Sequence, residues 1–171
     1  MKKSTITIVI PVFNVENFVN ETLLSVKRQI SQPDEVIVIN DGSTDGSSNI
    51  LNNFADLHGW KIIHTINQGL GLTRNLGRSI AKSDYIYFLD SDDIIKNDLI
   101  LRMREIIEEY NKPDMILFSG ECFDENGTNK KKPNQKFNLN GQFLHKSKLI
   151  TELTNLNETL PQASRYITKV E

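Results

Sequence analysis

The chain has 171 residues, of which 38% are hydrophobic and 25% are charged. This length suits one domain with a buried core and is too short for two, and the composition excludes the disordered and fibrous classes. The formal net charge of -2 at pH 7 gives no basic field that would attract nucleic acid, so local chemistry must hold any anionic ligand.

The sequence favours a reducing compartment, because its one cysteine, Cys122, has no partner for an internal disulfide. The basic start of the chain and the apolar run at residues 6–13 resemble a short signal peptide. That run is brief, contains threonine and lacks a cleavage site of small residues. No stretch is long enough to cross a bilayer. We expect a cytoplasmic protein, and peripheral contact with a membrane stays open.

Strand and helix patterns alternate along the first two-thirds of the chain. Short apolar, β-branched runs predict strands at residues 5–12, 35–40, 61–66, 85–89 and 115–119. Apolar residues at helical spacing predict helices at residues 17–29, 47–57, 72–80 and 99–110. The last of these helices should begin near Asn97 and Asp98, which would supply its cap.

This alternation predicts an α/β protein with a mostly parallel sheet and helices on both faces, a three-layer, Rossmann-like arrangement. The strand order does not follow from the sequence. From residue 121 the pattern fades: residues 124–140 form a polar segment with Lys130, Lys131 and Lys132, and residues 143–171 are expected to be partly helical. We therefore divide the chain into a core, residues 1–120, and a second region, residues 121–171.

Ligands of such sheets bind beyond the carboxyl ends of the strands, and four polar motifs lie there. At the end of the first strand, Pro11 turns the following loop over the sheet edge and Phe13 offers a flat wall for a base, whereas Glu16 also fits a helix N-terminus. After the second strand, helix capping accounts for Ser43, Thr44 or Asp45 but not for Asp41. The Asp41 carboxylate could accept hydrogen bonds from a pyrimidine or a ribose hydroxyl.

The third motif, residues 67–77, is rich in glycine but lacks the spacing of a dinucleotide fingerprint. It predicts a loop with close backbone approach and then a helix whose first turn presents Arg74. That guanidinium could pair with a diphosphate or position acidic residues across the cleft. A surface arginine is the alternative.

The fourth motif, Asp90-Ser91-Asp92-Asp93, closes a hydrophobic strand. Carboxylates this close repel one another unless a cation neutralises them. Hard oxygen ligands suit Mg²⁺ or Mn²⁺, which keeps waters and shares phosphate oxygens. The motif therefore predicts a metal site, with the capping of a following helix by Asp92 or Asp93 as the alternative.

As a set, these motifs resemble glycosyltransferase family 2, the inverting transferases that use nucleotide-sugars, over about the first 120 residues. The resemblance implies a GT-A fold and a donor of the UDP-sugar type, used with a saccharide or lipid-linked acceptor in surface polysaccharide or lipopolysaccharide synthesis. It implies that Asp92 is the main metal ligand of an Asp-x-Asp motif. The implied donor-binding residues are Pro11, Phe13, Glu16, Asp41, Arg74, Asp90, Ser91 and Asp92, with Asp92 and Asp90 at the metal.

The sequence departs from the family in its catalytic base, the acidic residue that takes the proton of the attacking hydroxyl. Glu121, Asp124 and Glu125 are available, but none belongs to a convincing acidic pair. We expect the base beyond Glu171, in a chain of which these residues are the donor-binding part.

Three other functions could account for parts of this pattern. A non-catalytic module that binds a nucleotide-sugar would carry the same motifs. A sugar-phosphate nucleotidylyltransferase needs a basic, glycine-rich loop after the first strand, and residues 13–16 do not provide one. A receiver domain also places acids at strand ends but gives no reason for the loop that carries Arg74.

Overall fold

The computed structural model describes residues 3–118 and 166–170. Each predicted element up to residue 117 is present, within three residues at either end. The strands are β1 (Ile6–Val12), β2 (Glu35–Asp41), β3 (Lys61–Thr65), β4 (Tyr85–Phe88), β5 (Met115–Leu117) and β6 (Tyr166–Lys169); the helices are α1 (Val19–Lys27), α2 (Ser47–His58), α3 (Leu70–Ile80) and α4 (Leu99–Glu109).

These strands form a six-stranded sheet in the order β3-β2-β1-β4-β6-β5. Neighbouring strands from β3 to β4 are parallel, and β6 runs antiparallel to both β4 and β5. The prediction of a mostly parallel sheet is confirmed. The order supplies what the sequence did not: β1 lies in the middle, with β2 and β4 on either side.

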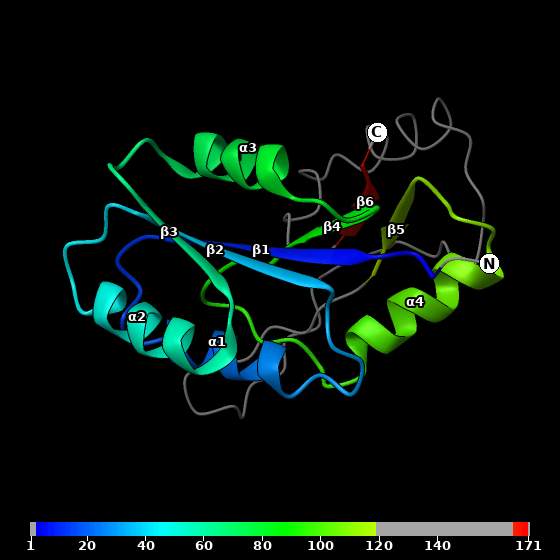
Figure 1. Cartoon of the computed structure of the whole chain (residues 1–171), viewed down its shortest axis with the longest axis horizontal. Coiled ribbons are helices and arrows are strands. Elements are labelled where there is room, and N and C mark those ends of the chain that lie inside the picture. Colours follow the sequence, from blue (N-terminus) through cyan, green and yellow to red (C-terminus); the bar gives the residue numbers. More distant parts are fainter. Residues whose placement is uncertain (1–2, 119–165, 171) are drawn as a thin grey trace, which may run out of the picture.

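Helices cover both faces of the sheet, as predicted (Figure 1). α1, α2 and α4 lie on one face, where Leu23, Leu51 and Ile100 join the larger buried cluster. α3 lies on the other face, where a smaller cluster contains Val9 and Ile39. Every side chain of β1 is buried, which explains its continuous apolar sequence.

The sheet continues past the predicted core into β6, a strand that the sequence analysis missed. Four residues without clear alternation give a weak strand pattern, and their pairing with β4 and β5 comes from distant parts of the chain. The expected helical residues between 143 and 160, the polar segment 124–140 and Cys122 lie outside the described residues. The division at residue 120 stays a prediction.

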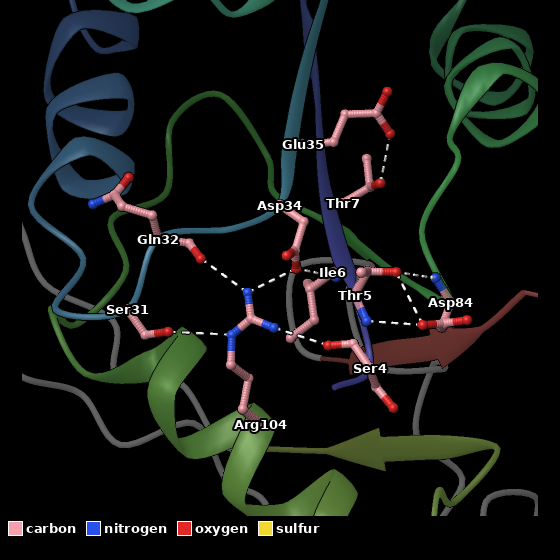
Figure 2. A network of polar contacts seen from close by, with 10 residues as sticks. All are labelled: Ser4, Thr5, Ile6, Thr7, Ser31, Gln32, Asp34, Glu35, Asp84 and Arg104. Carbon is pink, nitrogen blue, oxygen red and sulfur yellow. Dashed lines mark hydrogen bonds and ion pairs between the residues drawn. The ribbon is translucent and has the colours of Figure 1, made fainter. Parts of the chain in front are cut away.

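A polar network ties the amino ends of β1 and β2 to α4 (Figure 2). Arg104 is buried and donates hydrogen bonds to the Ser4 carbonyl, the Gln32 carbonyl, the Ser31 hydroxyl and the Asp34 carboxylate, at 2.7–3.1 Å. All of its donor nitrogens have partners, which is how a buried charge is tolerated. This end of the sheet is therefore fixed by structural contacts.

Within the described part of the chain, no helix combines the length and the apolar character needed to span a bilayer.

Candidate nucleotide-sugar site

A hollow of about 490 Å³ opens at the carboxyl ends of β1, β2 and β4. The strand register brings these ends together, because Val12 is paired with Asn40 and Val9 with Phe88. Six of the eight predicted donor-binding residues line it, and Glu16 and Arg74 do not. The lining residues are Pro11, Val12, Phe13, Val15, Asp41, Asn67, Gly69, Leu70, Thr73, Asp90, Ser91 and Asp92.

The loops that follow β1 and β2 are joined by hydrogen bonds between side chains and backbone. The Asn14 carboxamide accepts the Thr44 N–H at 2.8 Å, and the Ser43 hydroxyl accepts the Asn14 N–H at 3.1 Å. Asn14 has a φ of 51°, a conformation that asparagine adopts more readily than most residues. Asp45 accepts the N–H of Ser47 at the start of α2, so the predicted capping role is confirmed for Asp45.

Glu16 belongs to this junction and not to the hollow. Its carboxylate accepts the Gly46 N–H at 2.5 Å, and its own N–H donates to Asp45 at 3.0 Å. The carboxylate thus sits at the amino end of α2, where the helix dipole favours a negative charge. The alternative interpretation, an acid at a helix N-terminus, describes Glu16 better than donor binding does, although the helix is α2 and not the one that follows in sequence.

Asp41 is buried, at 3% exposure, and faces the loop that follows β3. Its carboxylate accepts hydrogen bonds from the Gln68 N–H, the Gly69 N–H and the Thr65 hydroxyl, at 2.8–3.1 Å. Burial raises the pKa of Asp41, but these hydrogen bonds outweigh burial and bring the pKa below its ordinary value. Asp41 therefore has a structural role that the sequence analysis did not foresee, while it also lines the hollow.

The predicted close backbone approach occurs between this loop and the turn after β2. Gly42 has a φ of 73°, and a Cβ there would lie 2.6 Å from the Asn67 backbone nitrogen. Glycine is required at this position on both counts. The contact sets the side of the hollow that Asn67, Gly69 and Leu70 form.

Arg74 pairs with Asp90, with 2.5 Å between Nη2 and Oδ1. α3 begins at Leu70, so Arg74 opens the second turn of the helix and not the first as predicted. Of the two roles proposed for it, the geometry matches the positioning of an acidic residue across the cleft. The ion pair also reduces the repulsion between the clustered carboxylates, because Arg74 already neutralises the charge of Asp90.

The other residues of the motif differ in their surroundings. Ser91 is buried and Asp92 is exposed on the rim of the hollow. Burial, and then the charges of Asp93 and Asp90, raise the pKa of Tyr87 beneath the motif, so its phenol stays neutral. Asp98 directly precedes α4, as predicted, but the predicted side-chain cap is wrong: the Asp98 carboxylate makes no capping hydrogen bond and instead pairs with Arg102 at 3.5 Å.

Whether these residues fit a divalent ion depends on how many ligands they offer. Among the described residues, no group of three His, Cys, Asp or Glu side chains could enclose a metal. Asp92 and Asp90 are hard oxygen donors on an open rim. Such a set fits an ion that takes its other ligands from phosphate and water, as Mg²⁺ usually does, and does not fit a closed structural site.

The chain is similar in sequence to known glycosyltransferases. GlyA of Streptococcus pneumoniae, a glycosyltransferase, is 39% identical over 121 residues, 70% of this chain and 17% of its own length. The poly(ribitol-phosphate) beta-glucosyltransferase of Bacillus spizizenii is 38% identical over 117 residues, 66% of this chain and 18% of its own length. The chain thus spans less than a fifth of either relative.

Two solved structures of residues 1–349 of Staphylococcus aureus TarS, with UDP and with UDP-GlcNAc, have the same core. Each matches with a TM-score of 0.61 and 28% identity over 66% of this chain, and over 34% and 33% of the TarS chains respectively. The fold is that of the GT-A glycosyltransferases. The sequence model described as Glycosyl transferase family 2 matches residues 7–165, and the chain belongs to that family.

Proposed function

We propose that the protein is a glycosyltransferase that moves a sugar from a nucleotide-diphosphate donor of the UDP-sugar type to a saccharide or glycolipid acceptor in surface polysaccharide synthesis. Membership in family 2 supports the reaction class, and the TarS complexes with UDP and UDP-GlcNAc support the donor class. The inverting course, the acceptor and the cytoplasmic location are parts of the same proposal.

One observation carries the proposal: the described residues that line the hollow include three aspartates and no lysine, arginine or histidine. A diphosphate that entered alone would meet negative charge from Asp41, Asp90 and Asp92, with Arg74 already engaged by Asp90. A divalent cation removes this repulsion. When bound, Mg²⁺ or Mn²⁺ would also stabilise the negative charge that develops on the diphosphate as the bond to the sugar breaks.

The position of each residue in the hollow indicates which part of the donor it would contact. Phe13, at 45% exposure, offers an aromatic face at one side of the hollow, and aromatic faces stack on bases. The Asp41 carboxylate can still accept a further hydrogen bond, from the base or the ribose of the donor. Asp92 would be the main ligand of the metal at the diphosphate end, and Asp90, held by Arg74, would be the weaker second ligand.

The metal role is tested with Asp92→Asn, which keeps the shape of the side chain and removes its charge. We expect UDP affinity in Mn²⁺ to fall at least about tenfold, because a direct ligand should matter no less than an outer-shell partner. Affinity in EDTA should not fall, because the substitution also removes one of the negative charges that repel a metal-free diphosphate. Isothermal titration of UDP in Mn²⁺ and in EDTA measures both values.

Asp98→Asn is the matched control, because Asp98 is an acid of the same connection between β4 and α4 that does not line the hollow. It should bind UDP as the wild-type protein does. Wild-type affinity that is equal in Mn²⁺ and EDTA would contradict the metal role.

A non-catalytic nucleotide-sugar-binding module is the second candidate, because the hollow at the strand ends accounts for donor binding and would serve such a module equally well. Donor hydrolysis and sugar transfer by the whole protein, assayed with UDP-sugars and Mn²⁺, separate the two functions. Metal-dependent UDP binding with neither reaction would favour the module.

A further inference from the structure

α1 buries a polar stripe where a helix in this position would normally bury apolar residues. Thr22, Ser25 and Gln29 follow one another at spacings of three and four residues, which places them on one side of the helix and its end. Their exposures are 0%, 5% and 4%. Buried polar groups destabilise a fold unless they are hydrogen-bonded, so the partners of this stripe show its purpose.

The partners lie in the connection between β4 and α4, which begins with the acidic motif. The Thr22 hydroxyl donates to the Ser91 carbonyl at 2.8 Å. The Ser25 hydroxyl accepts the Ile95 N–H at 3.2 Å. The stripe thus binds the backbone of a segment that forms neither strand nor helix.

Gln29 holds the far end of the same connection. Its amide nitrogen donates to the Lys96 carbonyl at 2.8 Å, and its amide oxygen accepts the Ile100 N–H at 3.1 Å. The second contact occupies an N–H in the first turn of α4, which Asp98 leaves without a side-chain cap. From Ser91 to Ile100 the connection is hydrogen-bonded to α1 and to Gln29, which follows α1.

The contact between Thr22 and Ser91 bears most directly on the site. The Ser91 carbonyl belongs to the same planar peptide unit as the Asp92 N–H. A hydrogen bond to that carbonyl therefore restrains the rotation of the unit and with it the direction in which Asp92 leaves the backbone. Asp90, on the other side of Ser91, is held through its own side chain by Arg74.

We propose that Thr22, Ser25 and Gln29 are positioning residues for the acidic motif, which they set so that Asp92 faces the diphosphate end of the hollow. This inference rests on the proposed function. The three side chains touch no ligand themselves and act through the backbone of residues 91–100.

The test compares two variants that each remove one buried hydroxyl without changing the shape of the side chain. Thr22→Val removes the donor to Ser91. Thr7→Val is the control: Thr7 is equally buried, but its hydroxyl donates to Glu35 at 2.8 Å toward the amino end of β1, away from the hollow. Thr22→Ser keeps the hydroxyl and should restore wild-type behaviour.

Two measurements are made under conditions in which urea unfolding shows every variant to be folded. The first is amide hydrogen exchange at residues 91–95 without ligand, which Thr22→Val should accelerate and the other two variants should not. The second is the gain in UDP affinity on adding Mn²⁺. We expect Thr22→Val to reduce this gain roughly three- to tenfold, the worth of about one hydrogen bond.

The outcomes separate the inference from the function beneath it. A full Mn²⁺ gain in Thr22→Val, even with faster exchange, would make the stripe purely structural and overturn the inference alone. An equal loss in Thr7→Val would assign the effect to general destabilisation and also overturn it. If the wild-type protein shows no gain, the proposed metal role fails first and the inference fails with it.

Discussion

Asp41 illustrates how one residue can serve the fold and the hollow together. Its carboxylate closes the loop after β3 onto β2 by accepting two backbone N–H groups and a hydroxyl. The same side chain lines the space where a base would bind. A substitution at Asp41 therefore changes the shape of the hollow as well as its chemistry.

The lowered pKa of Asp41 predicts an acid-sensitive contribution to stability. Because the folded-state pKa lies below the unfolded value, this contribution is fully present above about pH 4 and is lost as the pH falls through the folded pKa. Asp41→Asn should lower the free energy of unfolding at pH 7 by about 2 kcal/mol. Its free energy of unfolding should fall less than that of the wild-type protein between pH 6 and pH 3.

Urea unfolding at several pH values measures both quantities. Asp92→Asn serves as the control, because Asp92 is exposed and holds no loop in place. If Asp41→Asn and the wild-type protein lost stability in parallel toward low pH, the hydrogen bonds to Asp41 would not be the source of the acid dependence.

The sequence predicted which residues would gather at the site more successfully than what each would contact. Position at the carboxyl end of a strand or just after it was enough to bring Pro11, Asp41 and Asp92 to one hollow. The partners of Glu16 and Arg74 were not predictable, because their choice depends on how neighbouring loops and helices pack and not on local spacing.

Among the elements, α3 has a constraint that its sequence pattern does not display. Gly77 faces the sheet, where an added Cβ would clash with Val9 Cγ1 and approach Ile39 within 3.3 Å. The glycine lets the helix lie close on β1. Since α3 also carries Arg74 and Thr73, this close packing determines where both residues lie relative to the hollow.

Gly77→Ala should therefore lower the free energy of unfolding by about 1–3 kcal/mol, the usual effect of overpacking a core. Gly71→Ala is the matched variant in the same helix. A Cβ at Gly71 meets nothing within 4 Å, so the higher helix propensity of alanine should raise stability by about 0.5–1 kcal/mol. Urea denaturation of both variants measures the difference.

Equal effects of the two substitutions would show that helix propensity decides at both sites and that the contact with Val9 yields without strain. The double variant Val9→Ala, Gly77→Ala gives a second check, because removing the Val9 methyl groups should make the loss at position 77 smaller.

The predicted elements were recovered because periodicity marks long, regular segments well. Their caps were less predictable: in the first turn of α4 the Ile100 N–H donates to Gln29, 71 residues earlier in the chain, and the Asp98 side chain makes no capping hydrogen bond as it was expected to. β6 was missed because its four residues, of mixed polarity, become a strand only through pairing with β4 and β5.

Across the whole molecule, the two ends of the parallel sheet differ in purpose. The carboxyl ends carry the open hollow, and the amino ends are closed by the network around Arg104 (Figure 2). The separation predicts that stability and donor binding can be changed independently.

Arg104→Met should lower the free energy of unfolding by about 3 kcal/mol, because it leaves the partners of a buried charge unsatisfied. UDP affinity of the folded protein should change less than about twofold, the small effect expected of a site with no shared partners. Arg102→Met is the control. Arg102 is exposed, and its surface pairs with Asp98 and Glu105 should contribute less than about 1 kcal/mol.

Urea unfolding and UDP titration in Mn²⁺ measure the two properties on the same preparations. A loss of UDP affinity in Arg104→Met comparable to that expected of Asp92→Asn would show that the two ends are coupled.

The position of β6 determines how this protein can fold during its synthesis. β1 to β4 can pair with one another once residue 88 has been made, so four of the six strands can assemble early on the ribosome. β5 pairs with β6 and not with β4 in the described sheet. The three residues of β5 can therefore join the sheet only after residue 169 has emerged from the ribosome. Until then, the side of β4 that later pairs with β6 stays open to pairing with another nascent chain.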